Sequence, residues 1–338
     1  MAESLSRLLA PYRSASIIGM CKNAGKTTVL NRIIRELAED GGTLALTSIG
    51  RDGEATDLVT GTKKPGIYIP AGSLVATAAD LLRLSDFTKE VVDTTPYYTP
   101  MGQVVLLRAR SDGNVQLAGP SMTAQLAELN AAFFALGADK VLIDGAISRK
   151  TLCSRRVTEA TVLCTGASYH RDLEVVLEDT RHVVRLLTLP EVGSAALRAA
   201  VEKMDNPRGA LLAGENGVVP AAGSLDTILR GKAARGAAYL FLGGALTDNA
   251  LRPVLMSNAP MKGLCLVVRD GSKLLLSADS LEKLTLRGAS LRVLDSVNLV
   301  ALTVNPFSAY GFSFDRRELK SRMAELVPVP VIDVEEEE

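Results

Sequence analysis

An apolar run that passes through a glycine-containing loop directly into a helical pattern constrains this chain more than any other feature. Residues Ser14–Met20 form a predicted strand, the loop ends in Gly25-Lys26-Thr27-Thr28, and Lys26–Asp40 has helical periodicity that stops at Gly41-Gly42. Short apolar runs alternate with helical patterns along most of the 338 residues. The pattern predicts an α/β fold in which helices cover a parallel or mixed sheet.

The loop has the residue types that bind the phosphates of a nucleotide. Backbone N–H groups of such a loop and of the following helix N-terminus surround the phosphate oxygens, and glycine lets the backbone approach them closely. Lys26 is placed to reach the β- and γ-phosphates, and the Thr27 hydroxyl is placed to ligate Mg²⁺. We therefore expect Mg²⁺ and a nucleoside triphosphate to bind through Gly19, Lys22, Asn23, Ala24, Gly25, Lys26, Thr27 and Thr28.

The spacing of this motif departs from the common one. The usual loop has four residues between its first glycine and Gly-Lys-Thr, whereas five residues separate Gly19 from Gly25 and Met20 holds the regular position. A loop of this length occurs in synthetase-like relatives, and the strand-loop-helix context is intact. The alternative is a Gly-Lys-Thr that caps a helix by chance. Lys22 stands four residues before Lys26, whereas the extra lysine of partition-type ATPases stands five before, so Lys22 is either a phosphate contact or an ordinary loop residue.

A Mg²⁺-dependent site of this kind also needs an acid at the end of a neighbouring strand, and Asp144 fits this role. The apolar run Val141–Ile143 predicts a buried strand over Lys140–Ile143, which Asp144 and Gly145 follow directly. The alternative is an aspartate that merely starts a turn.

A second acid lies in the loop after the predicted strand Thr43–Ile49. Loops at this position become ordered around the γ-phosphate in many phosphate-loop proteins. Asp52 is placed there to bind metal-bound water or to orient the attacking water. Arg51 and Glu54 are weaker candidates, because Arg-Asp-Gly-Glu is also an ordinary turn sequence. The predicted catalytic residues are Lys26, Asp52 and Asp144, and the predicted metal ligands are Thr27, Asp52 and Asp144.

Recognition of the base is less well defined by the residues. The guanine-specific Asn-Lys-x-Asp motif is absent from the expected position. The predicted strand Leu299–Val304 ends at Asn305-Pro306, which places the Asn305 amide against a purine edge, although Asn-Pro is also a common turn. The residues therefore favour ATP over GTP only modestly, and GTP stays open.

Two domains are expected from the length and rhythm of the chain. Residues 1–189 form the predicted P-loop nucleotide-binding domain, a three-layer α/β sandwich with a mainly parallel sheet. Residues 64–118 form a β-rich insertion within it. Residues 190–338 repeat the alternation of strands and helices and form a predicted second α/β domain. Because no low-complexity linker separates the halves, we expect them to pack closely.

Charge and cysteine content disfavour several classes of function. Lys+Arg and Asp+Glu are equal at 38 each, so no net field attracts nucleic acid or an anionic membrane. The four cysteines are far apart, and His170 and His182 stand twelve residues apart, which argues against a disulfide framework and a metal site. No apolar stretch reaches the length of a membrane span or a signal peptide, so we expect a soluble cytoplasmic protein. Glu335–Glu338 are expected to form a solvated tail, with a regulatory role as the alternative.

Several segments together resemble one family. They are Gly19–Thr28, Thr47–Glu54, Lys64–Ile69, Thr99–Gly102, Ala118–Pro120, Ile143–Ala146 with Arg149-Lys150, and Thr303–Pro306. This set resembles the smaller subunit of the reactivase for adenosylcobalamin-dependent lysine 5,6-aminomutase, and similar proteins associated with ornithine aminomutase. The resemblance spans roughly Ser14 to Asp315, and Thr47–Glu54 and the Asp144 segment are its most specific parts.

The resemblance implies a nucleotide-driven partner of an adenosylcobalamin- and pyridoxal-phosphate-dependent aminomutase. Such a partner works with a second ATPase subunit similar to mismatch-repair MutS proteins and releases inactivated corrinoid, so that fresh cofactor enters. Two alternatives stay open. One is an ATP-dependent ligase or kinase of the dethiobiotin-synthetase type, which shares the five-residue spacing, and the other is a module that binds nucleotide without turnover. The lack of a His/Cys tract disfavours a GTPase metallochaperone, and a homodimer is also left open.

Overall fold

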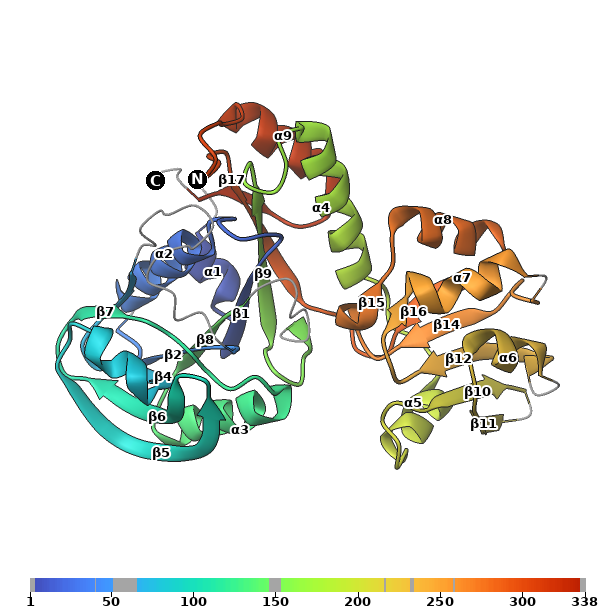
Figure 1. Ribbon diagram of the computed structural model, residues 1–338, viewed down its shortest axis with the longest axis horizontal. Coiled ribbons are helices and arrows are strands. Elements are labelled where there is room, and N and C mark those ends of the chain that lie inside the picture. Colours follow the sequence, from blue (N-terminus) through green and yellow to red (C-terminus); the bar gives the residue numbers. More distant parts are fainter. Residues whose placement is uncertain are drawn as a thin grey trace. The chain divides into compact units, whose positions relative to one another are not determined.

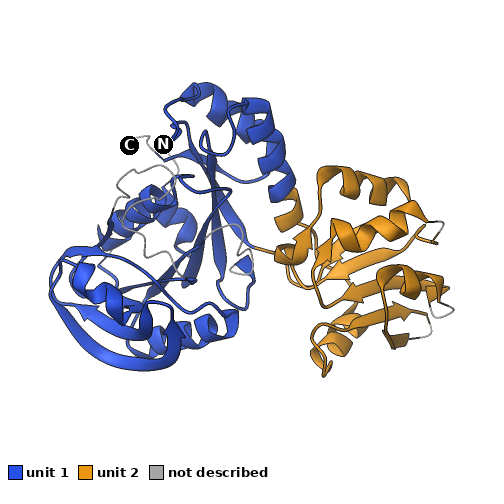
Figure 2. Ribbon diagram, in the orientation of Figure 1, with its two compact units in different colours: residues 1–184, 298–338 blue, residues 185–297 orange. Residues whose placement is uncertain are grey.

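The computed structural model describes residues 4–39, 41–50, 66–145, 153–215, 217–231, 234–257 and 259–334. The chain divides into two compact units, residues 1–184 with 298–338 (unit 1) and residues 185–297 (unit 2), as Figure 2 shows. The sequence-based division gave all of 190–338 to the second domain, whereas in the structure the chain returns to unit 1 at Asn298. The reason is that Leu299–Asn305 pairs with a strand of unit 1, and such long-range pairing leaves no local signal in the sequence. Close packing of the halves stays a prediction.

A nine-stranded sheet forms the centre of unit 1 (Figure 1). Its order is β18-β17-β9-β1-β8-β2-β4-β6-β5, and the strands from β18 to β4 run parallel. The strands are β1 (Ser14–Gly19), β2 (Leu44–Ser48), β4 (Leu74–Ala78), β5 (Lys89–Thr99), β6 (Gly102–Ala109), β8 (Lys140–Asp144), β9 (Ala160–Gly166), β17 (Leu299–Asn305) and β18 (Val331–Asp333). The fold is mixed α/β with a large, mostly parallel sheet, as the sequence pattern predicts.

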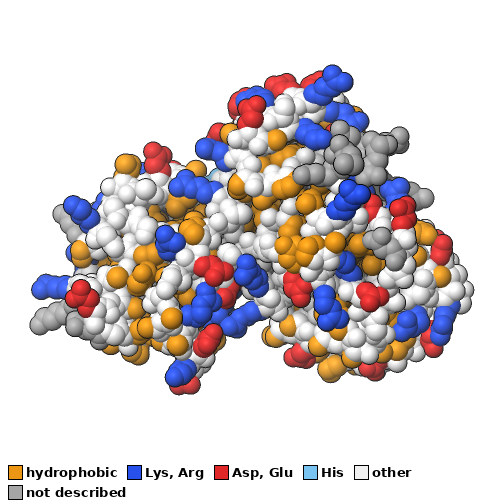
Figure 3. Space-filling view, turned by 180° about the vertical axis from the view of Figure 1, so that it is seen from behind, with side chains coloured by type: hydrophobic (Ala, Val, Ile, Leu, Met, Phe, Trp, Pro, Cys, Tyr) orange, Lys and Arg blue, Asp and Glu red, His pale blue; other side chains and the backbone are white. Residues whose placement is uncertain are grey.

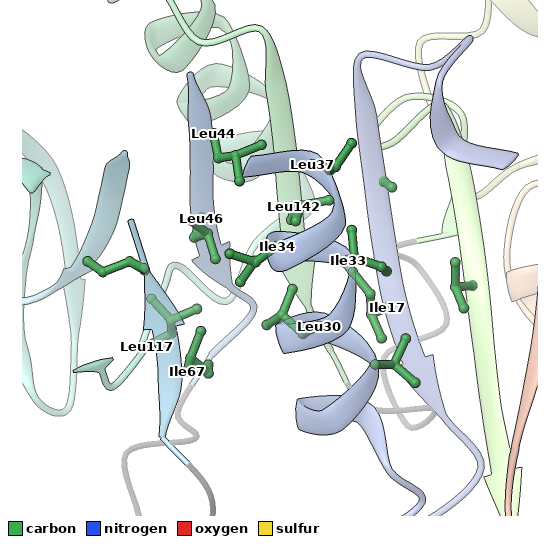
Figure 4. Packing of buried hydrophobic residues seen from close by; sticks show 14 of the residues in the cluster. Ile17, Leu30, Ile33, Ile34, Leu37, Leu44, Leu46, Ile67, Leu117 and Leu142 are labelled. Atoms are coloured by element: carbon green, nitrogen blue, oxygen red, sulfur yellow. The ribbon is translucent and has the colours of Figure 1, made fainter. Parts of the chain in front are cut away.

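Helix α2 (Lys26–Glu39) packs its apolar stripe on this sheet (Figure 4). Its buried side chains recur at intervals of three and four, which is the period of one helix face, and they are Val29, Leu30, Ile33, Ile34 and Leu37. They meet apolar side chains of the strands, among them Ile17, Leu44, Leu46 and Leu142. Each buried aliphatic side chain contributes about 1.5–3 kcal/mol. This packing fixes the N-terminus of α2 at the end of β1.

The predicted β-rich insertion turns out to be largely an extension of the main sheet. β4, which the sequence did not predict, pairs with β2, and β6 and β5 continue the sheet in antiparallel fashion. Among the described residues of this region, only β3 (Ile67–Ile69) and β7 (Gly113–Val115) form a separate pair. The edge strand β5 carries Pro96 and two register shifts, features that discourage pairing with another strand. The helices of unit 1 that the structure describes besides α2 are α1 (Leu5–Leu9), the 3₁₀ helix η1 (Ala79–Leu84), α3 (Thr123–Ala135), α4 (Leu173–Leu187, whose last three residues belong to unit 2) and α9 (Arg316–Leu326).

Unit 2 is a smaller α/β unit around a five-stranded sheet of order β11-β10-β12-β14-β16. β12, β14 and β16 run parallel, and β10 and β11 are antiparallel additions at one edge. Its elements are α5 (Ala195–Glu202), β10 (Ala210–Gly214), β11 (Gly217–Ala221), α6 (Leu225–Arg230), β12 (Ala237–Leu242), β13 (Leu246–Thr247), α7 (Asp248–Met256), β14 (Cys265–Val268), η4 (Gly271–Lys273), β15 (Leu274–Leu275), α8 (Ala278–Leu286) and β16 (Ser290–Val293).

On the face drawn in Figure 3, acidic and basic side chains are interspersed, so their fields partly cancel there. Among the residues that the structure describes, no helix has the length and apolar character needed to cross a membrane.

Candidate functional site

The carboxyl ends of five neighbouring parallel strands bring the predicted site residues to one edge of the sheet. Ile17 of β1 and Ser48 of β2 both stand in register with Asp144, the last residue of β8. Gly19 is paired with Cys164 of β9, and Asn305 of β17 with Gly166. In open parallel sheets, ligands bind in the crevice outside the carboxyl ends of the strands. The strand order therefore assembles residues that lie up to 286 positions apart in sequence, from Gly19 to Asn305.

The loop between β1 and α2 has the backbone conformation of an anion-binding nest. Asn23 has a φ of 60° and Gly25 a φ of 88°, two left-handed residues that flank Ala24. Alternation of this kind turns successive N–H groups toward a common point, where an anion is bound. None of the described residues accepts a hydrogen bond from the backbone N–H groups of Lys26, Thr27 or Thr28, which form the first turn of α2. These donors and the positive end of the helix dipole face the same loop.

Lys26 lies across Gly19, which explains why the last residue of β1 is a glycine. A Cβ on Gly19 would come within 2.9 Å of Lys26 Cγ and Cδ and within 3.2 Å of Nζ. The ammonium donates one long hydrogen bond, 3.4 Å, to the carbonyl of Cys21. A bond of this length is weak. The lysine is thus held over the loop by packing and is able to exchange this acceptor for a stronger one.

Asp144 is buried, with 4% of its surface exposed. The charges of Asp144 and Lys26 both act on one group, the thiol of Cys164. Burial raises the pKa of the Cys164 thiol to about 12, while Lys26 lowers this pKa and Asp144 raises it. Both charges therefore lie within electrostatic reach of one sulfur atom. Burial likewise raises the pKa of Cys21 to about 11 against the pull of Lys26, so this loop cysteine is a protonated filler rather than a reactive thiolate.

The segment that leaves β2 is directed toward Asp144. The Ile49 N–H donates to the Asp144 carbonyl at 3.1 Å, and the Gly50 N–H donates to the Pro120 carbonyl at 3.1 Å. Gly119 crosses the end of β2 so closely that a Cβ would sit 1.9 Å from the Ser48 carbonyl oxygen.

The predicted residues Arg51, Asp52 and Glu54 follow this segment and lie outside the described residues, so their roles stay predictions. Lys22 is exposed in the loop, which leaves its role open. Among described residues, no group of three or more His, Cys, Asp or Glu is arranged to hold a metal by itself. The residues near the nest that fit Mg²⁺ are oxygen donors, the Thr27 hydroxyl and the Asp144 carboxylate, whose chemistry suits this cation.

Asn305 lies beside Gly25 of the loop between β1 and α2, and its predicted role at a purine edge stays a prediction. A Cβ on Gly25 would be 3.3 Å from Asn305 Nδ2 and 3.6 Å from Cγ2 of Val334. The Asn305 Oδ1 accepts a hydrogen bond from the Phe307 N–H at 2.9 Å, which orients the amide. The proximity of Val334 was not foreseen, because β18 is a short strand that follows two prolines and has little local signal.

Beside Asn305, two loops join into an aromatic rim that the sequence analysis missed. The Ala309 N–H of the turn 306–314 donates to Ser168 Oγ at 3.1 Å, and the Arg171 guanidinium carbon lies 5.6 Å from the centre of the Phe312 ring. Phe307 and Tyr310 are about half exposed on this turn, at 51% and 53%. The sequence signal that could have indicated this rim is the local composition, because four of the chain's fourteen Phe and Tyr residues fall within 306–314.

A cavity of about 500 Å³ lies in unit 2 and is lined by Asp248, Arg252, Leu255, Met256, Ser277, Asp279, Ser280 and Lys283. Asp248 accepts hydrogen bonds from the Ser277 N–H (3.0 Å) and hydroxyl (3.3 Å), which ties it to the N-terminus of α8. Lys283 pairs with Asp279 at 2.6 Å. Both of these acids therefore already have partners: Asp248, the first residue of α7, holds Ser277 at the start of α8, and Asp279 pairs within α8.

Comparison of the chain with protein-family models, with curated proteins and with solved structures gave no match.

Proposed function

We propose that this chain is a P-loop NTPase of the three-layer sandwich type that binds Mg-ATP at the carboxyl edge of the unit 1 sheet. The observation that carries the proposal is the combination of three features at one place. They are the left-handed residues Asn23 and Gly25 in the loop, Lys26 folded over Gly19, and the buried Asp144 in register on the next strand. A helix that begins with Gly-Lys-Thr by chance has no need for left-handed residues in the preceding loop or for a buried acid in register on the next strand.

Each residue of the proposed site has a distinct role. The nest and the first turn of α2 bind the β-phosphate through backbone N–H groups. Lys26 exchanges its weak contact with the Cys21 carbonyl for the β- and γ-phosphate oxygens. Thr27 and Asp144 hold Mg²⁺, which when bound neutralises charge on the transferred phosphoryl group. Asp52 orients the attacking water, and Asn305 with the aromatic rim receives the base, since every base has a face on which aromatic side chains stack. Such stacking accepts GTP as well as ATP.

The test uses substitutions that separate binding from turnover. Lys26→Ala should weaken ATP binding on the order of 100-fold, because the phosphates lose a charge-assisted partner in a preorganised site. Asp144→Asn should keep nucleotide binding while Mg²⁺-dependent hydrolysis falls on the order of 100-fold. Binding is measured by isothermal titration calorimetry and hydrolysis by phosphate release. Lys203→Ala and Asp205→Asn, both exposed in unit 2, are the matched controls. Unchanged binding in Lys26→Ala would refute the site, and unchanged turnover in Asp144→Asn would move the metal ligand elsewhere.

The biological role that we propose is that of a reactivating subunit for an adenosylcobalamin-dependent aminomutase, together with a MutS-like ATPase subunit. The support is the resemblance carried by Gly19–Thr28, Thr47–Glu54 and the Asp144 segment. The assay mixes the protein and second subunit with an aminomutase holoenzyme inactivated by turnover and follows corrinoid release after gel filtration. Release should require ATP and Mg²⁺ and disappear with Lys26→Ala. Corrinoid release that is independent of ATP, or absent, would refute this role.

The five-residue loop spacing favours one second candidate, a ligase or kinase of the dethiobiotin-synthetase type. It predicts that ADP forms only when a small carboxylate or hydroxyl substrate is present. The reactivase predicts that ADP formation rises with the mutase or the second subunit, and a pure sensor predicts tight binding without ADP under either condition.

A further inference from the structure

The surface that α7 and α8 form in unit 2 exposes large apolar side chains. Met256 on α7 and Leu286 on α8 are the two most exposed large apolar side chains among the residues that the structure describes, at 83% and 79%. Leu275, at the end of β15 just before α8, is 52% exposed. Exposed apolar side chains that lie close together mark a surface that another molecule covers.

The two helices lie side by side and are tied together at both ends (Figure 1). At their N-terminal ends, Asp248 accepts hydrogen bonds from the N–H and the hydroxyl of Ser277. At their C-terminal ends, the Arg287 guanidinium donates to the Leu255 carbonyl at 3.1 Å and to the Ala259 carbonyl at 3.0 Å. Because like ends meet, α7 and α8 run parallel with their first turns at the same level. The cavity of about 500 Å³ lies along this pair of helices, so they form one continuous surface.

Both helices present side chains in the same order along this surface. An acid in the first turn is followed by a base one turn later and by an exposed apolar residue one turn after that. The spacing of three or four residues keeps these side chains on one face of each helix. They are Asp248, Arg252 and Met256 on α7, and Asp279, Lys283 and Leu286 on α8. We call these six residues and Leu275 the α7–α8 surface.

The order acid, base, apolar is complementary to itself when it is reversed. A two-fold axis that crosses both helices between the acid and the base brings a second copy antiparallel onto the first. Asp279 of each copy then faces Lys283 of the other, and Asp248 faces Arg252. One axis serves both helices because their acids stand at the same level. Leu286 of one copy comes opposite the start of α8 in the other, where Leu275 is exposed.

The contacts within one chain leave these groups able to bind a second copy. Lys283 already pairs with Asp279 of its own helix at 2.6 Å, but an ionised carboxylate has two oxygens and accepts more than one hydrogen bond. Among the described residues, none forms an ion pair with Arg252. Its guanidinium, with five N–H donors, is therefore able to take a carboxylate of another molecule.

We propose that the α7–α8 surface binds the same surface of a second copy of this chain, in a two-fold symmetric dimer. The apolar side chains stabilise the contact, and the charges set its antiparallel direction, because a parallel arrangement would bring acid against acid. Each helix has nine residues and is about 13 Å long, so the contact is small for a specific interface. The dimer is therefore weak and forms at elevated protein concentration. It involves unit 2 alone and does not depend on the proposed nucleotide site.

The experiment measures the oligomeric state of the full chain by sedimentation velocity without nucleotide. The protein concentration is varied over an about hundredfold range, because the population of a dimer follows mass action. The sedimentation coefficient should rise from the monomer value toward the dimer value. Asp279→Lys and Lys283→Asp should each raise the dissociation constant more than about tenfold, because like charges then face each other across the interface.

Mixing the two charge variants separates a contact between copies from an effect within one chain. In an equimolar mixture, the two cations of the Asp279→Lys chain face the two carboxylates of the Lys283→Asp chain, so dimers should form again. Circular dichroism checks that both variants are folded. A third variant, Met256→Ser with Leu286→Ser, leaves the charges in place and removes only exposed apolar groups, and it should also lose the dimer.

Matched controls make the same changes of charge at the end of α5, which packs on the opposite face of the unit 2 sheet. Glu202→Lys and Lys203→Asp alter exposed residues there and should dimerise as the unmodified chain does. A chain that sediments as a monomer at every concentration would overturn the inference. So would a dimer that the charge and serine variants leave unchanged, because it would use another surface. A mixture of the two charge variants that stays monomeric would show that these charges do not meet across an interface, and would overturn it as well.

Discussion

Replacing Gly19 by alanine tests whether the last residue of β1 must lack a side chain so that Lys26 can lie across it. The new methyl group would come within 2.9 Å of Lys26 Cγ and Cδ. Carbon atoms pack at about 3.5–4.0 Å, so the lysine stem has to move by roughly 0.6–1.1 Å. A movement that forces the stem out of a staggered torsion costs about 0.5–1.5 kcal/mol. The backbone at Gly19 is not left-handed, so alanine itself introduces no further strain.

We expect Gly19→Ala to lower the affinity for Mg-ATP about two- to tenfold, since about 1.4 kcal/mol corresponds to a factor of ten. Thermal unfolding should shift by only a few degrees, because a flexible side chain absorbs the clash. Isothermal titration calorimetry measures the first quantity and scanning calorimetry the second. Gly193→Ala is the control, because its Cβ meets no described atom within 4 Å. Unchanged affinity would refute the role of Lys26 over Gly19, and a large loss of stability would show that the lysine does not absorb the clash.

Two other predictions follow from the same edge of the sheet. Gly166→Ala should lower the free energy of unfolding by more than about 3 kcal/mol, because the new Cβ would lie 2.0 Å from the Asn305 carbonyl oxygen. Chemical denaturation measures this free energy, and an unchanged denaturation midpoint would contradict the prediction. Burial raises the pKa of the Cys21 thiol to about 11, so the rate at which iodoacetamide alkylates Cys21 should keep rising up to about pH 11. Mass spectrometry measures alkylation at this residue, and a rate that reaches a plateau near pH 9 would contradict the prediction. The raised pKa also makes the free energy of unfolding depend on pH. The contribution of Cys21 is complete below pH 9, where its thiol is protonated in the folded and the unfolded chain, and it is lost as the pH rises toward 11.

Local elements with a clear period were predictable from the sequence. The predicted helix Lys26–Asp40 corresponds to α2 (Lys26–Glu39), and the predicted strand Lys140–Ile143 corresponds to β8 (Lys140–Asp144). In both cases the apolar spacing itself contains the information, because one helix face or one buried strand must be apolar to pack. The meeting of Gly19, Asp144 and Asn305 at one edge was partly predictable too, since each follows an apolar run and parallel strands end together.

Pairing across long distances was not predictable in the same way. β17 inserts between β9 and β18 although more than 130 residues separate it from β9, so the C-terminal segment was wrongly expected to stay in the second domain. β4 (Leu74–Ala78) is buried at every position and therefore lacks the alternation that marks a half-exposed strand. β18 lies at a sheet edge, where prolines are tolerated, so Pro328 and Pro330 before it made the strand hard to predict, although this strand places Val334 beside Gly25.

The odd spacing of the phosphate motif has a physical reason in this arrangement. Met20, which holds the position of the usual first glycine, is buried and donates its N–H to the Cys164 carbonyl at 2.8 Å, so strand pairing continues one residue beyond Gly19. The glycine is needed one position earlier because the Lys26 stem crosses the chain there. The left-handed residues that shape the nest, Asn23 and Gly25, stand closer to the helix and are unaffected by this shift. A glycine at position 20 would therefore remove a buried side chain without improving the phosphate site that we propose, and the regular motif is not the better one for this chain.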